Sequence, residues 1–333
     1  MCSPANVTTG SLAYLPRVIG DGHAERTILT SDGVRLHVHD YGSAAAADHT
    51  VVLLHGLSVS QESWAGQIVE LRRRWGSAVR IITYDHRGHG HSSGASIHSY
   101  RIDRLAADLA DVLTTMRVKG PLTLAGHSMG GMTALAYLGR PATKRPVEPQ
   151  GLVLIATAAG RLTERGIGRL LATRATEALF EVVNHLPQRA TDRAVRGLMR
   201  PVRGILNRIS SGGDPDPNGM APVAAAAIRS ISLSTAAGFF NSLKRYDQYH
   251  TLASIAAKTI VVSGGRDIVT PVVHARDLAR AIPGSMHLHR PNAGHMILQD
   301  APQCVSAAIN SAMNLLHDSA RIADDSPRLA GVS

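Results

Sequence analysis

The stretch Pro121-Leu-Thr-Leu-Ala-Gly-His-Ser-Met-Gly-Gly131 decides the fold. A short apolar run leads into a glycine-flanked turn, and an Ala- and Leu-rich helical pattern follows from Met132. This order predicts a strand, a sharp turn at Ser128 and a helix. Both flanking glycines fit, because a Cβ at either position would collide with the neighbouring strand or helix. We expect the turn to lift the Ser128 hydroxyl clear of the sheet and to place the Met129 amide at a helix N-terminus.

On either side of this stretch, strand and helix patterns alternate along the chain. Strands are expected over 51–54, 79–84, 151–156, 259–263 and 286–289, and helices over 61–75, 101–118, 129–138, 272–281 and 301–317. A hairpin with its turn at 31–33 is expected over 25–41. Continuous apolar strands separated by helices are typical of a parallel, doubly wound sheet. The sequence therefore predicts the α/β class.

The alternation breaks at about residue 158, and a helical pattern without a clear strand continues to about 250. We therefore divide the chain into five segments. They are a loosely ordered segment 1–24, a first core part 25–158, a helical cap insertion 159–250, a second core part 251–317, and a disordered tail 318–333.

Two further segments supply partners for a serine nucleophile. Acyl transfer by serine needs a base within hydrogen-bond reach, an acid that orients the base, and N–H donors for the oxyanion. Asp267 and His295 each follow an expected strand. Taken singly, Asp267 could be a turn aspartate. The chain has 17 histidines, and His295 could simply be a polar surface residue. Their place at the carboxyl edge of a parallel sheet, where sites collect, favours a catalytic role with Ser128.

With these motifs in this order, the chain resembles the serine-nucleophile branch of the α/β-hydrolase fold family over about 25–160 and 240–317. The resemblance implies an eight-stranded, mostly parallel sheet with a helical cap or lid. It implies Ser128 as nucleophile, His295 as general base and Asp267 as the acid that orients the base. By position, it also implies an oxyanion hole formed by the backbone N–H groups of Leu57 and Met129.

The run Asp85-His-Arg-Gly-His-Gly-His-Ser92 resembles a structural loop of the same family. Its three histidines at 86, 89 and 91 could also be read as metal ligands. The loop interpretation is the stronger one, so the sequence predicts neither a metal nor a cofactor.

The cap has a charge signature of its own. Between residues 161 and 210 it carries ten arginines and four acidic residues, a net charge of +6. A basic amphipathic helix can lie on an anionic membrane surface, but the same pattern suits a lid helix with solvated arginines. We favour the lid, and both interpretations predict an apolar pocket beneath it. Its candidate substrate-binding residues are Phe180, Leu198, Met199, Phe239 and Phe240.

Composition limits the remaining functional classes and cellular locations of the protein. The 333 residues carry a net charge of +10, but no zinc-finger, RNP or helix-turn-helix pattern accompanies it, so we expect no nucleic-acid partner. The apolar runs are strand-length, no secretory signal pattern is evident, and the two cysteines at 2 and 304 suggest no disulfide framework. We expect a cytoplasmic protein, with peripheral contact between the basic cap and an anionic membrane as an open alternative.

The resemblance implies a carboxylic ester hydrolase, similar to monoacylglycerol-lipase-like and other small esterases, acting on a lipid-like ester with an apolar acyl group. A serine nucleophile excludes the related branches that use aspartate. An acyltransferase, thioesterase, lactonase or carbon–carbon bond hydrolase could use the same triad. A non-catalytic ligand receptor and a peripheral membrane-binding protein are the alternatives outside enzymes.

Overall fold

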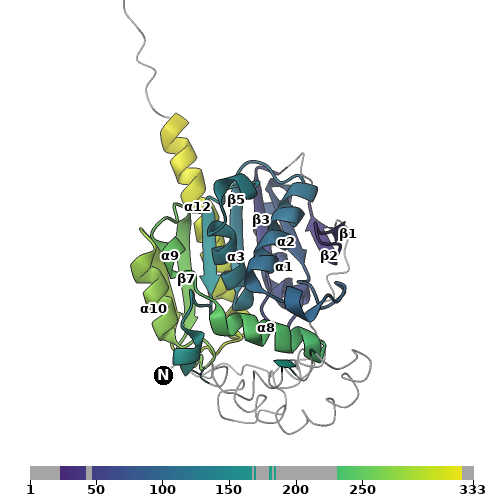
Figure 1. Ribbon diagram of the computed structural model, residues 1–333. Coiled ribbons are helices and arrows are strands. Elements are labelled where there is room, and N and C mark those ends of the chain that lie inside the picture. Colours follow the sequence, from purple (N-terminus) through teal and green to yellow (C-terminus); the bar gives the residue numbers. More distant parts are fainter. Residues whose placement is uncertain are drawn as a thin grey trace, which may run out of the picture.

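The computed structural model has one eight-stranded sheet between two layers of helices (Figure 1). The structure describes residues 23–42, 47–166, 169, 180–181, 184 and 231–324, with side chains up to residue 313. The strands are β1 (His23–Leu29), β2 (Arg35–Tyr41), β3 (His49–Leu54), β4 (Val79–Tyr84), β5 (Leu122–His127), β6 (Gly151–Ile155), β7 (Lys258–Gly264) and β8 (Met286–Arg290).

The helices of the described part follow the same alternation. The α-helices are α1 (Ala65–Trp75), α2 (Ile102–Thr115), α3 (Met129–Leu138), α8 (Leu233–Arg245), α9 (Tyr249–Leu252), α10 (Val272–Ala281), α11 (Ile297–Asp300) and α12 (Pro302–Asp324). Short 3₁₀ helices are η1 (Gln61–Trp64), η2 (Gly76–Ala78), η3 (Ile97–Ser99), η4 (Ala142–Lys144) and η5 (Leu162–Glu164). Among the described residues, no helix has the length and apolar character needed to cross a membrane.

The strand order is β1-β2-β4-β3-β5-β6-β7-β8. β1 pairs with β2 and β2 with β4 in antiparallel fashion, and every later pair is parallel. This confirms the predicted α/β class and the eight-stranded, mostly parallel sheet. Because β3 and β5 are neighbours at its centre, the loops that follow them meet at one edge.

Both faces of the sheet are covered, which explains why the central strands are continuously apolar. Side chains alternate between faces along β3. Val52 and Leu54 lie in one core with residues of α2, α3 and α8, whereas Val51 and Leu53 lie in a second core with residues of α1 and α12. The central strands β3, β4, β5 and β6 are therefore buried on both sides.

Most expected elements form within a residue or two of their predicted bounds, but the last helix does not. The disordered tail was expected from Asp318, yet α12 continues to Asp324. The stretch 318–324 contains alanines and an arginine, which favour helix and allow it to extend beyond the core. In Figure 1 this end of α12 projects away from the sheet. β1 also begins slightly earlier than expected, at His23.

The insertion between β6 and β7 is described at its two ends and at residues 169, 180–181 and 184 between them. Its first turn is η5, and α8 and α9 lead back into β7. The side-chain hydroxyl of Ser232 accepts a hydrogen bond from the amide of Thr235 and so caps the start of α8. The rest of the expected cap lies outside the described residues.

A buried arginine holds the β1–β2 hairpin to the body of the protein. The Arg87 guanidinium, in the loop after β4, donates two hydrogen bonds of 2.8 and 2.6 Å to the Asp108 carboxylate on α2. It donates two more, of 2.9 and 3.0 Å, to Asp32 in the hairpin turn. The side chains of Arg87 and Asp108 are fully buried. Three segments thus converge on one guanidinium.

Removing the charge of one partner of the Arg87–Asp108 ion pair should destabilise the folded protein. We expect Asp108→Asn to lower the free energy of unfolding by about 3 kcal/mol, because a buried guanidinium loses a charged partner. The exposed pair Arg101–Asp103 provides the matched control, and Asp103→Asn should cost less than about 1 kcal/mol. Urea unfolding followed by circular dichroism measures both. Equal losses in the two variants would contradict the assignment.

Candidate active site

The turn after β5 places Ser128 at the carboxyl edge of the sheet in a strained conformation. Ser128 has φ 51° and ψ −117°, a region that side chains rarely adopt. A Cβ at Gly130 would lie 2.1 Å from the carbonyl oxygen of Leu54 on β3, and one at Gly126 would lie 2.5 Å from the backbone of Gly130. Only glycine allows α3 to start this close to the strands, as the sequence predicts.

Ser128, His295 and Asp267 form one continuous hydrogen-bonded chain. His295 Nε2 lies 3.0 Å from Ser128 Oγ, and His295 Nδ1 lies 2.9 Å from Asp267 Oδ2. Asp267 follows β7, and His295 lies between β8 and α11. Three residues that are distant in sequence therefore meet at one edge, in the order that a serine nucleophile, its base and an orienting acid require.

The second partner of the histidine is a buried carboxylate that the protein keeps ionised. Asp267 Oδ1 accepts the amides of Val269 and Thr270 at 2.8 and 2.9 Å. Asp267 Oδ2 accepts the Thr270 hydroxyl at 2.8 Å. Burial by itself would raise the pKa of the Asp267 carboxyl, but His295 and these hydrogen bonds outweigh burial and hold that pKa below its usual value.

Three supporting contacts were not anticipated from the sequence. The Thr270 hydroxyl lies 3.5 Å from His295 Nδ1, beside its bond to the aspartate. His127 Nε2 donates to the backbone carbonyl of His295 at 2.8 Å, and the Thr157 hydroxyl donates to the carbonyl of Ser128 at 2.7 Å. A threonine three residues after Asp267 is a recognisable turn signal. The other two contacts carry no local signal.

The backbone amides of Leu57 and Met129 are the candidate donors of an oxyanion hole. Met129 is the first residue of α3, so its N–H has no intrahelical partner. The loop after β3 lies against the nucleophile, because a Cβ at Gly56 would lie 3.2 Å from Ser128 Cβ. Among the described residues, neither the Leu57 nor the Met129 amide donates to a protein acceptor. Both donors proposed from the sequence are thus available.

The loop from Asp85 to Ser92 is held together by its own aspartate. The Asp85 carboxylate accepts the amides of Gln61 and His91, each at 2.9 Å, and the Ser92 hydroxyl donates to the Asp85 carbonyl at 2.6 Å. These bonds fit the predicted structural loop. Of its histidines, His86 and His89 are buried and His91 is exposed.

Buried histidines surround the site in their neutral form. His55 Nε2 accepts the His86 amide, and His89 Nε2 accepts the Ser58 amide. Burial lowers the pKa of His55 to about 4 and the pKa values of His89 and His127 to about 3. These three imidazoles are therefore uncharged at neutral pH, and they act as fixed hydrogen-bonding groups.

A comparison of the sequence with models of protein families identifies a family with the same fold. Residues 49–302 match the family described as alpha/beta hydrolase fold, which is more than half of the chain. The chain belongs to the alpha/beta hydrolase fold family. Its expected membership is thereby confirmed.

Relatives of this hydrolase carry several activities in their names. The sn-1-specific diacylglycerol lipase ABHD11 of Mus musculus is 26% identical over 267 residues, which cover 78% of this chain and 80% of that protein. The AB hydrolase superfamily protein YisY of Bacillus subtilis is 25% identical over 86% of this chain and 98% of its own. The non-heme chloroperoxidase CPO-A1 of Kitasatospora aureofaciens is 36% identical, but over only 35% of this chain and 39% of that protein.

Solved structures of an esterase and an enol-lactonase share the fold of this hydrolase. A thermophilic esterase from Thermogutta terrifontis superposes with a TM-score of 0.69 at 24% identity, covering 88% of this chain and 99% of that one. The enol-lactonase from Burkholderia xenovorans superposes with a TM-score of 0.63 at 22% identity, covering 87% of this chain and 100% of that one. At this identity the likeness shows the fold alone.

The pocket residues expected in this hydrolase are only partly described. Phe239 is fully buried on α8, with its ring 5.7 Å from His89 and 5.3 Å from Tyr100, and Phe240 packs against the same core. The ring of Phe180 lies 5.9 Å from His98. Leu198 and Met199 lie outside the described residues, as do the arginines of the cap from 174 to 208. The substrate-binding role of all five stays a prediction.

The neutral histidines predict a loss of stability in acid. Once unfolded, His55, His89 and His127 take up protons below about pH 6.5, whereas in the folded hydrolase they do so only near pH 3 to 4. Stability must fall as the pH drops through this window, because the unfolded state binds more protons. Each of these histidines should lower the free energy of unfolding by about 2 kcal/mol at pH 5 relative to pH 7.5.

The variant His89→Gln tests the effect of one histidine. We expect it to be less stable at pH 7.5 but to lose about 2 kcal/mol less between pH 7.5 and pH 5. Urea unfolding curves at several pH values give the slope. His250→Gln, at an exposed position on α9, is the control and should keep the slope of the unaltered protein. An unchanged slope in His89→Gln would contradict the interpretation.

Proposed function

We propose that this protein is a serine hydrolase that cleaves carboxylic esters through an acyl-enzyme on Ser128. The observation that carries the proposal is the hydrogen-bonded chain from Ser128 Oγ through His295 to Asp267, with distances of 3.0 and 2.9 Å. Lipase and esterase relatives support the ester as substrate. The strained turn at Ser128 supports its role as nucleophile, since backbone strain gathers at functional sites.

In the acylation step, His295 Nε2 takes the proton of the Ser128 hydroxyl while Oγ attacks the ester carbonyl carbon. Negative charge then develops on the carbonyl oxygen, and the amides of Leu57 and Met129 are the donors that stabilise it. The start of α3 adds the favourable end of a helix dipole at Met129. The His295 imidazolium returns the proton to the leaving alcohol, and the ester bond breaks.

In the deacylation step, His295 activates a water molecule, which attacks the acyl carbon and releases the acid. Ser128 Oγ regains its proton from the imidazolium, and the site is restored. Asp267 holds the proton of His295 on Nδ1 and stabilises the imidazolium, so Nε2 stays free to face the serine. The His127 bond to the backbone carbonyl of His295 keeps the loop in place.

The acyl group of the substrate is proposed to be apolar. The predicted cap contributes phenylalanines at 180, 239 and 240 and apolar residues at 198 and 199. A diacylglycerol lipase among the relatives makes a lipid-like ester a sensible first substrate. Acyl transfer and lactone opening would use the same acyl-enzyme, so the assay must separate them.

A fluorophosphonate probe tests the nucleophile directly. We expect the unaltered protein to be labelled, and Ser128→Ala and His295→Ala to show no labelling. Asp267→Asn should hydrolyse p-nitrophenyl esters about 10⁴-fold more slowly, since the histidine loses the partner that fixes its tautomer. Ser77→Ala removes an exposed serine and should leave labelling unchanged. Absence of labelling in folded, unaltered protein would contradict the proposal.

A series of p-nitrophenyl esters from short to long acyl chains then sizes the pocket. We expect kcat/KM to rise with chain length until the pocket is filled. A diacylglycerol, a lactone and an added alcohol as competing acceptor distinguish hydrolysis from the other reactions of an acyl-enzyme. Labelling without hydrolysis of any ester would retain the activated serine and overturn the ester as substrate.

A further inference from the structure

A second group of chemically active side chains lies on the β1–β2 hairpin, away from the serine. His23 and Glu25 alternate along β1, and His39 and Tyr41 alternate along β2. The antiparallel register places Glu25 opposite His39 and His23 opposite Tyr41. Directly opposed residues project from the same face of a sheet, so the four side chains form one cluster.

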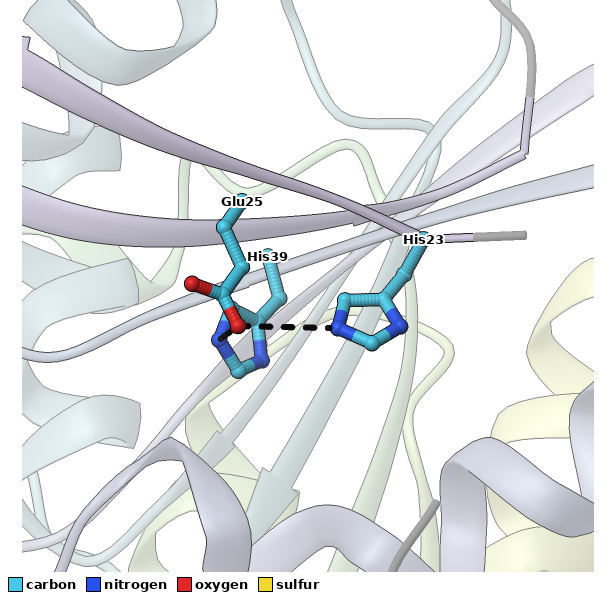
Figure 2. A group of neighbouring side chains, drawn as sticks. All are labelled: His23, Glu25 and His39. Atoms are coloured by element: carbon cyan, nitrogen blue, oxygen red, sulfur yellow. Dashed lines mark ion pairs between the residues drawn. The ribbon is translucent and has the colours of Figure 1, made fainter. Parts of the chain in front are cut away.

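Two imidazole nitrogens converge on a single carboxylate oxygen of Glu25. His23 Nε2 lies 3.9 Å and His39 Nε2 lies 3.8 Å from Glu25 Oε1 (Figure 2). The three ligand atoms all lie within 4.8 Å of one another. These separations are too long for hydrogen bonds. They are longer than the roughly 3.3 Å between neighbouring ligands of a tetrahedral zinc ion, so the three side chains must close in on a small cation to bind it.

The single hydrogen bond of the His39 ring uses Nδ1 and leaves Nε2, the nitrogen nearest Glu25, available to bind a cation. His39 Nδ1 lies 3.3 Å from the hydroxyl of Tyr41, and His39 Nε2 is buried without a hydrogen-bond partner among the described residues. With the proton on Nδ1 and donated to Tyr41, the lone pair of Nε2 points at Glu25.

A third histidine lies beside the other oxygen of the carboxylate and is arranged differently. Gln61 Nε2 lies 2.9 Å from His37 Nδ1 and 3.5 Å from the Asp85 carboxylate, so the amide nitrogen is the donor and His37 Nδ1 accepts. The proton of His37 is therefore on Nε2, which lies 3.6 Å from Glu25 Oε2. His37 Nε2 thus lies beside one carboxylate oxygen, and the other, Oε1, faces the two ligand nitrogens. Outer partners of this kind accompany metal ligands.

We propose that His23, Glu25 and His39 form a binding site for a divalent cation of the Zn²⁺ class. Two imidazoles and one carboxylate are a donor set that suits Zn²⁺ and related transition metals rather than Ca²⁺ or Mg²⁺, which prefer oxygen ligands. Glu25 is mostly exposed, so water can complete a four-coordinate shell. These histidines differ from those at 86, 89 and 91, which the sequence had brought into consideration.

The site would stabilise the hairpin rather than take part in ester cleavage. A cation there joins the first residue of β1 to β2 across the outermost pair of the sheet. β1 and β5 are four strands apart in the sheet order, which corresponds to roughly 19 Å. The cation would therefore lie far from Ser128, and its binding can be measured independently of the proposed activity.

Isothermal titration with Zn²⁺ tests the proposal on the full chain, without a histidine tag and in a buffer that does not bind metals. We expect one saturable equivalent in the unaltered protein. Glu25→Gln and His23→Gln should each weaken binding more than about 10-fold, the lower end of what loss of even an outer partner costs. His250→Gln, at an exposed position on α9, should bind as the unaltered protein does and controls for the many other histidines.

Two further measurements protect the test against a misfolded variant. Co²⁺ should give the visible absorption bands of a four-coordinate site, and Zn²⁺ should raise the Tm of the unaltered protein but not of Glu25→Gln. Glu25 is exposed and Gln has the same shape, so this variant is expected to fold. No saturable binding by the unaltered protein would overturn the proposal, and so would Glu25→Gln and His23→Gln variants that bind Zn²⁺ as tightly as the unaltered protein.

Discussion

The close approach of α3 to the central strands is the constraint on which the rest of the site depends. Gly130 lies so near the Leu54 carbonyl that a Cβ would come within 2.1 Å of it. This contact forces the chain to reverse within a few residues and holds Ser128 at a positive φ. The same contact brings the loop after β3 beside the serine. One packing restriction thus places both the proposed nucleophile and the loop that carries a proposed oxyanion donor.

The surroundings of this turn keep charge out of places where it would be costly. The ordinary response of a buried histidine is to remain neutral, and His55, His89 and His127 do so while bonding to backbone groups. Asp267 is also buried, but its carboxylate accepts enough hydrogen bonds to remain ionised. Asp267 therefore faces His295, the proposed base, as an ionised carboxylate.

The hairpin at the far edge of the sheet is attached through polar contacts at its turn and on β2. Arg87 binds the turn at Asp32, and Arg80 on β4 donates two hydrogen bonds of 2.8 and 2.9 Å to Asp40 on β2. An edge strand pair has fewer apolar neighbours than the central strands, so charged contacts contribute more of its attachment. The cluster of His23, Glu25 and His39 occupies the outer end of the same hairpin.

Sequence patterns predicted the elements of this protein that depend on local physics. Apolar runs located the strands of the sheet, since a strand covered on both faces must be apolar throughout. The glycines around Ser128 marked the turn, and the order of serine, aspartate and histidine at strand ends located all three members of the proposed triad. The extension of α12 beyond His317 was missed, because a polar segment can form helix when a packed helix precedes it.

Only the tertiary structure decided which distant groups meet. His127 bonds to the carbonyl of His295, which is 168 residues away, and no local pattern encodes such a contact. The histidines of the hairpin alternate visibly in the sequence, but the register between β1 and β2 determines that His37 and His39 lie beside Glu25. Local propensity and hydrophobic period thus set the elements of this chain. Pairing register and close packing, which act between segments, set the chemistry at their edges.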